Sequence, residues 1–109
     1  MPKPAAVFTA LSDPTRRGIL ESLQNGGQPA GKIAGLFHVS WPAISRHLRI
    51  LKAAGLVWET RDGRTRYYEL NPAALQPALT WLAQFRPNQT RQVSSSAPGP
   101  SLIGREYTS

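Results

Sequence analysis

Apolar residues recur at helical spacing through the first half of the chain. An apolar segment over residues 5–11 predicts a short first helix, and the stripe that follows it predicts a second helix from Pro14 to about Gln24. Asp13 suits the N-cap of this second helix because its carboxylate can accept from a free backbone N–H. Arg16 is expected outside the apolar stripe.

A short helix and a longer one come next. The short helix opens at Pro29 and is apolar as far as Phe37, and the longer one runs from Ser40 to about Ala54, where Gly55 ends it. The apolar residues of the longer helix are spaced by four and three: Ile44, Leu48 and Leu51. Two such helices joined by three or four residues are typical of a helix-turn-helix.

After Gly55 the hydrophobic period changes. Strands are expected from Leu56 and over residues 66–70, and Asp62-Gly63 between them indicates a hairpin. Asn71-Pro72 is expected to cap a last helix over 72–85, whose apolar residues are Leu75, Ala78, Leu79, Leu82 and Phe85. The pattern predicts a mainly α (α+β) winged helix-turn-helix with about five helices and one hairpin wing. Residues 1–87 would form this domain, and 88–109 a flexible tail.

The charge is strongly positive. Thirteen Lys and Arg face six Asp and Glu, a net charge of +7 with a sequence pI near 10.9. Six basic residues against two acidic ones lie between Arg46 and Arg66, so this fifth of the chain carries +4 of the total. Small basic domains bind polyanions, and the predicted fold places this charge where a winged helix meets DNA.

The longer helix is predicted to read base edges. With its apolar residues turned inward, its outer face presents short and basic side chains, and guanidinium groups can pair with guanine in the major groove. Three arginines on the hairpin can reach phosphates or a minor groove. The predicted DNA-binding residues are Ser40, Trp41, Pro42, Ser45, Arg46, His47, Arg49, Arg61, Arg64 and Arg66.

Three segments resemble the ArsR-type (arsenical-resistance repressor) family. They are residues 13–17, the run S-x-P-A-x-S-x-H-L-x-x-L-x-x-A-G-L-V over 40–57, and residues 63–68; the resemblance covers about 5–86. It implies a dimeric repressor that pairs through its first and last helices and reads a pseudo-palindromic operator. The expected interface residues are Val7, Phe8, Leu11, Leu75, Leu79 and Leu82, more apolar surface than one small domain readily covers.

The metal sites known in that family have no counterpart in this sequence. The chain contains no cysteine, and residues 72–85 contain no Asp, Glu or His. His38 and His47 alone make a poor metal site, and His47 is expected to be a structural or phosphate-contacting residue. We therefore expect no metal, no cofactor and no enzymatic activity. No signal peptide or membrane span is visible, so a cytoplasmic protein is expected.

The aromatic residues bear on alternative functions. Trp58, Trp81, Tyr67 and Tyr68 are predicted to be core residues rather than a ligand pocket, whereas Trp41 is expected on the exposed face. An exposed tryptophan would also suit a winged-helix module that binds proteins, and an RNA-binding or architectural protein is a weaker alternative. The effector is unknown: an organic ligand, a protein partner or the protein's own concentration, as in an autorepressor.

Overall fold

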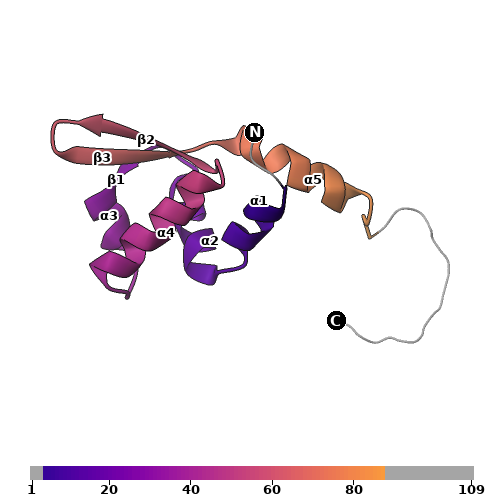
Figure 1. The fold of residues 1–109 in the computed structure, drawn as a ribbon, viewed down its shortest axis with the longest axis horizontal. Helices are drawn as coiled ribbons and strands as arrows, with labels where there is room; N and C mark the ends of the chain where they lie inside the picture. The colour runs from indigo at the N-terminus through magenta and orange to yellow at the C-terminus, as the bar shows by residue number, and fades with distance from the viewer. Residues whose placement is uncertain (1–3, 88–109) are drawn as a thin grey trace.

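The structure is a computed structural model that describes residues 4–87. Four helices precede a hairpin, and a last helix follows it (Figure 1). The helices are α1 (Pro4–Leu11), α2 (Pro14–Ser22), α3 (Ala30–Ala34), α4 (Trp41–Ala53), the 3-10 helix η1 (Pro72–Leu75) and α5 (Gln76–Ala83); the strands are β1 (Gln28–Pro29), β2 (Val57–Asp62) and β3 (Thr65–Leu70). Figure 1 shows the β2–β3 hairpin and α5 extending from opposite sides of the α1–α4 group. The predicted winged helix-turn-helix is confirmed.

Two of the predicted N-caps are present. The Asp13 carboxylate accepts from the backbone N–H of Arg16 at 3.1 Å, and the Ser40 hydroxyl accepts from the backbone N–H of Ala43 at 3.2 Å. Each cap satisfies a donor that has no partner inside its helix. At the other end of α4, Gly55 has φ +79°, a left-handed conformation that glycine adopts without steric cost.

One apolar core holds the helices and the sheet together. The predicted inner face of α4 is buried, and it meets apolar side chains from every neighbouring element. The largest fully buried side chains of the described chain are Val7, Ile19, Leu23, Ile33, Ile44, Leu51 and Leu56. Because Ile44, Leu48 and Leu51 of α4 lie in this core, the opposite side of the helix lies at the protein surface.

The sheet has three antiparallel strands in the order β1-β3-β2. In the hairpin Asp62 pairs with Thr65, so Gly63, with φ +66°, and Arg64 make the turn. The two-residue strand β1 pairs with Tyr67 and Tyr68 and was not predicted. Two residues are too few to show an alternating pattern, so the sequence contains no signal for β1.

Two predicted helix boundaries were wrong. α3 ends at Ala34, so six residues, 35–40, separate it from α4 rather than three or four. The last helix begins as a 3-10 turn, and Asn71 makes no side-chain cap there. Its side-chain amide instead donates to the carbonyl oxygen of Gly55 at 2.8 Å, which links the end of α4 to the start of η1.

The predicted positions of four large side chains were also wrong. Arg16, expected outside the apolar stripe, is only 9% exposed. Trp58, Tyr67 and Trp81, expected in the core, are exposed, and Tyr68 is the one of the four aromatic residues that is buried. Strand alternation explains Tyr67 and Tyr68, which must point to opposite faces of the sheet.

No helix among residues 4–87 is both long enough and apolar enough to cross a membrane.

Candidate nucleic-acid interface

The outer face of α4 presents the predicted DNA-binding residues of this helix except His47. Trp41 is 52% exposed, Pro42, Arg46 and Arg49 are exposed, and Ser45 is half-buried. Proline in the first turn of α4 removes no intrahelical hydrogen bond, so the helix begins cleanly at this end. The first turns of α4 therefore offer an indole, a proline ring and guanidinium groups to a partner.

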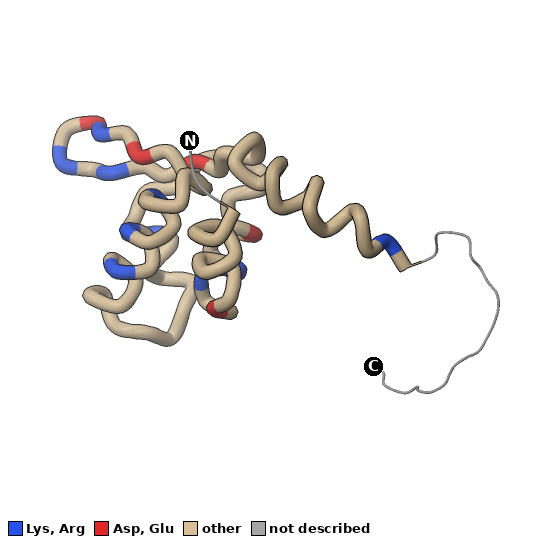
Figure 2. The backbone as a smooth tube through the Cα atoms, turned by 45° about the vertical axis from the view of Figure 1, so that its right-hand side comes forward, with Lys and Arg blue, Asp and Glu red and all other residues tan. Residues whose placement is uncertain are grey.

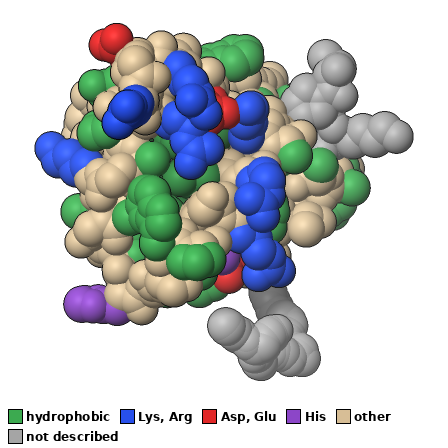
Figure 3. Space-filling view, turned by 60° about the vertical axis from the view of Figure 1, so that its left-hand side comes forward, with side chains coloured by type: hydrophobic (Ala, Val, Ile, Leu, Met, Phe, Trp, Pro, Cys, Tyr) green, Lys and Arg blue, Asp and Glu red, His purple; other side chains and the backbone are tan. Residues whose placement is uncertain are grey.

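The hairpin continues this basic surface. Arg61 and Arg66 are cross-strand partners in β2 and β3, and Arg64 lies in the turn. Arg61 and Arg64 are exposed, and Arg66 is half-buried. Figure 2 shows Lys and Arg along α4 and around the hairpin tip, and in Figure 3 the same residue types form a band on the face that includes these elements. The helix and the hairpin thus bring guanidinium groups from two separate elements to one side of the molecule.

Glu59 joins α4 to the hairpin. Its carboxylate, on β2, accepts from the ammonium of Lys52 at 2.5 Å and from the hydroxyl of Tyr68 at 3.2 Å, and it lies 3.6 Å from Arg66 Nη1. The hydrogen bond from Lys52 lowers the pKa of Glu59, while burial raises the pKa of Tyr68. Two of the six cations counted from the sequence are thus engaged by this carboxylate, so Arg46, Arg49, Arg61 and Arg64 are the basic side chains of this region that it leaves unengaged.

His47 faces the interior of the protein rather than the outer surface of α4. Its side chain is 13% exposed, and Nδ1 lies 3.1 Å from Arg16 Nη1 and 4.0 Å from an oxygen of Asp13. The hydrogen bond from the backbone of Arg16 lowers the pKa of Asp13. Sequence reasoning missed the role of Arg16, because a charged residue beside an apolar stripe gives no sign of burial.

The opposite end of the molecule is apolar. Among the residues predicted for a subunit interface, Leu79 and Leu82 are exposed, Phe8, Leu11 and Leu75 are half-buried, and Val7 lies inside the core. Trp81 and Phe85, both exposed, extend this surface, and Trp81 packs edge-on against Phe8 and Phe85 with ring centroids 5.6 and 4.9 Å apart.

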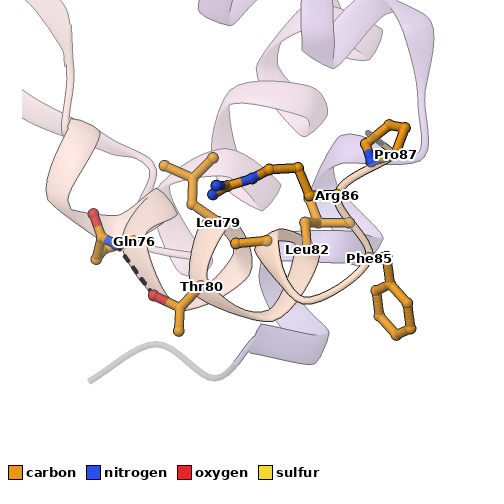
Figure 4. A pocket seen from close by; sticks show the side chains of 8 residues that line it. Gln76, Leu79, Thr80, Leu82, Phe85, Arg86 and Pro87 are labelled. Carbon is orange, nitrogen blue, oxygen red and sulfur yellow. Dashed lines mark hydrogen bonds between the residues drawn. The ribbon is translucent and has the colours of Figure 1, made fainter. Parts of the chain in front are cut away.

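Two open hollows lie on this apolar end. Figure 4 shows the first, lined by α5 and the turn that follows it: Gln76, Leu79, Thr80, Leu82, Ala83, Phe85, Arg86 and Pro87. The second lies between α1 and α5 and is lined by Pro4, Ala5, Phe8, Pro77, Thr80, Trp81 and Gln84. Neither hollow contains an acidic side chain.

No group of three His, Cys, Asp or Glu side chains that could hold a metal ion occurs within residues 4–87.

Comparisons with known proteins agree with this geometry. Residues 13–58 match the family model described as bacterial regulatory protein, arsR family. The transcriptional repressor SdpR of Bacillus subtilis (strain 168) is 48% identical over 79 residues, which cover 72% of this chain and 88% of that protein.

Solved structures agree as well. An ArsR-like transcriptional regulator from Rhodococcus sp. RHA1 is 40% identical with a TM-score of 0.66, over 74% of this chain and 76% of that one. A protein of Mycobacterium bovis, described as a homodimeric winged helix-turn-helix DNA-binding domain, is 30% identical with a TM-score of 0.61, over 73% and 76% of the two chains. With sequence and fold both matched over most of its length, the chain belongs to the ArsR family of bacterial regulatory proteins, which are transcriptional regulators and not enzymes.

Proposed function

We propose that this protein is a homodimeric repressor that binds a pseudo-palindromic double-stranded operator with α4 in the major groove. The observation that carries this proposal is the convergence of exposed guanidinium groups from α4 and the hairpin on one side of a winged helix-turn-helix. The naming of a 48% identical relative as a transcriptional repressor supports the direction of regulation.

The residues divide by the part of the duplex they would meet. Arg46 and Arg49 would read base edges, because an extended guanidinium can donate two hydrogen bonds to O6 and N7 of guanine. Trp41 and Pro42, at the start of the helix, would contact thymine methyl groups or the sugar backbone. The hydroxyl of Ser40 already accepts a hydrogen bond from Ala43, so its contribution would be to fix the first turn.

The hairpin arginines would contact the backbone. Arg61 and Arg64 are exposed and far from the core, and a protruding cation can reach a phosphate or a narrow minor groove without base-specific geometry. Arg66 is half-buried and lies 3.6 Å from Glu59, so it would contribute less to this contact.

The dimer would form through α1 and α5. Leu79, Trp81, Leu82 and Phe85 lie exposed together on α5 and the turn after it, a larger apolar cluster than a monomer ordinarily leaves in water. The Mycobacterium bovis neighbour is described as homodimeric, which supports the same arrangement. Two-fold symmetry would then place two α4 helices about 34–36 Å apart, one turn of DNA.

We further propose that this dimer binds DNA without a metal effector. The two histidines of the chain lie on different elements, and His47 is engaged by Arg16. In this proposal residues 1–87 carry both DNA binding and dimerisation. The predicted tail, 88–109, lies outside the described residues.

Fluorescence anisotropy tests the proposal. The purified protein would be titrated onto DNA from upstream of its own coding sequence and onto a scrambled duplex, each at two salt concentrations. We expect tight binding to the first duplex alone, with log K falling steeply as log salt rises because phosphate contacts release counterions. Salt-insensitive binding, or none to any duplex, would contradict the proposal and favour a protein partner at Trp41.

A further inference from the structure

Arg16 is the buried cation of the described chain, and it joins three helices. Its Nε donates to the carbonyl oxygen of Ala10 at 2.8 Å, and its Nη2 donates to that of Thr9 at 3.2 Å. Both carbonyls lie in the last turn of α1, beyond the reach of the helix's own i+4 donors, and that of Thr9 also accepts from the backbone N–H and the hydroxyl of Ser12. The third contact, from Nη1, crosses to His47 on α4. One side chain of α2 therefore holds α1 and α4 in a fixed relation.

The contact between Arg16 and His47 requires one form of the imidazole. A guanidinium can only donate hydrogen bonds, so His47 Nδ1 must accept and cannot carry a proton. The ring in this arrangement is neutral, with its proton on Nε2. A proton added to Nδ1 would set two donors 3.1 Å apart beside a permanent positive charge.

The charged groups around His47 offer it a second arrangement. Arg16 on α2 lies 3.1 Å from Nδ1, and the carboxylate of Asp13, the N-cap residue of α2, lies 4.0 Å from it. The described part of α1 carries no titratable side chain, and on α4 the adjacent ionisable residues are Arg46 and Arg49. A protonated ring would therefore leave Arg16 for Asp13, the one acceptor among these groups.

We propose that His47 is a positioning residue, which in its neutral form accepts from Arg16 and so fixes α4 relative to α1 for DNA binding. The inference rests on the proposed binding of duplex DNA by α4. Its consequence is that operator affinity falls when a proton is added to the ring, because Nδ1 can then no longer accept from Arg16. α1 belongs to the proposed dimer surface, so the same contact would fix the spacing of the two α4 helices.

The direction of the pH effect separates this role from a direct contact with DNA. A histidine that touches a phosphate gains a positive charge on acidification, which strengthens binding and steepens the salt dependence. A histidine that must stay neutral to hold α4 has the opposite effect. The chain contains only two histidines, so substitution of His38 removes the other histidine that could cause such a pH dependence.

The experiment compares three proteins by anisotropy on the operator duplex from pH 8 to pH 5.5 at constant ionic strength. His38→Gln removes the exposed histidine of the turn before α4 and should behave as the wild type does. Both should lose roughly tenfold in affinity at pH 5.5, the scale of one hydrogen bond to a charged group. In His47→Asn the amide oxygen lies near the position of Nδ1 and can accept a hydrogen bond at every pH. The affinity of this variant for the operator should be within about threefold of wild type at pH 8 and should not change with pH.

A second measurement needs no DNA. Nitrogen-15 spectra of the imidazoles at pH 8 should show His47 with its proton on Nε2, and in Arg16→Gln this preference should weaken. Failure of the wild type to bind any duplex would contradict the proposed function while these spectra still test the contact. A proton on Nδ1, a wild-type affinity that is constant or rises at low pH, or an unchanged pH dependence in His47→Asn would each overturn the inference.

Discussion

The two ends of this molecule present opposite kinds of surface. On α4 and the hairpin the exposed side chains include four arginines, Arg46, Arg49, Arg61 and Arg64, whereas α5 and the turn after it expose a cluster of leucine, tryptophan and phenylalanine. Neither kind of side chain is needed by the core of the protomer, which is complete without them.

The two surfaces differ in the free energy of leaving them exposed to water. An exposed guanidinium is well solvated and needs no partner, so the basic end is stable in the free protein and gains energy only near a polyanion. An exposed apolar cluster orders water at a cost of about 25 cal/mol per Å², so the apolar end favours burial at all times. We therefore expect a dimer that is stable with or without DNA, and DNA binding that depends on the presence of the duplex and on the salt concentration.

The largest effect is expected at the apolar end. Leu79→Asp would place an unpaired charge in the proposed dimer interface and cost about 3–5 kcal/mol of association free energy. Sedimentation velocity should then show a monomer. Gln24→Asp adds the same charge at an exposed residue outside that end and should remain dimeric. A dimer in Leu79→Asp would remove α5 from the interface.

Next in size are the substitutions on α4. Arg46→Ala or Arg49→Ala should weaken operator binding by about 1–3 kcal/mol while affinity for scrambled DNA changes much less, because a base-reading contact carries sequence information. Anisotropy on both duplexes measures the ratio of the affinity for the operator to the affinity for scrambled DNA. An unchanged ratio would mean that these arginines contact only the backbone.

The hairpin should behave differently from α4. Arg64→Ala should weaken all duplexes alike, roughly fivefold at physiological salt, and reduce the slope of log K against log salt by about one phosphate contact. The measurement is a salt titration of wild type and variant on the two duplexes. A change in sequence preference would show that the wing reads bases.

The smallest effect concerns the junction between the two DNA-facing elements. Glu59→Gln should lower the free energy of unfolding by about 1 kcal/mol at pH 7, a modest value because Lys52 is largely exposed and solvent screens the pair. The pKa of Glu59 is lowered in the folded protein, so its contribution is present above its ordinary value of 4.5 and is lost as the pH falls through the lowered value.

Urea unfolding at pH 7 and pH 3 measures this contribution. The difference in free energy of unfolding between wild type and Glu59→Gln should shrink as the pH falls and the native carboxylate takes up a proton. Glu21→Gln, which changes an exposed carboxylate of α2, is the matched control and should have little effect at either pH. A difference that does not shrink as the pH falls would assign the effect to packing rather than to charge.

Local rules were sufficient for most of the fold. The caps at Asp13 and Ser40, the inward face of α4 and the left-handed Gly55 each depend on residues within about two turns of one another. The outward face of α4 followed directly, since a helix that buries one apolar face exposes the residues on the opposite side. For the same reason helical spacing is enough to assign Trp41, Arg46 and Arg49 to the outer face.

Other features depend on residues far apart in the sequence. Asn71 was expected to cap a helix but bonds to Gly55, and Trp58 was expected in the core but lies on the outer face of the sheet. In each case a local preference competes with a partner from another element, and the pattern of one segment holds no information about that partner.

Periodicity, caps and turns act over a few residues, so the amino-acid sequence was enough to predict the helices, the hairpin, the family and the basic outer surface of α4. The burial of Arg16 against His47 and the end of α1, and the engagement of two basic residues by Glu59, depend on how the elements pack together. The physical reason is that a charged side chain enters a protein interior only where carbonyl, imidazole or carboxylate partners are already assembled, and packing assembles them.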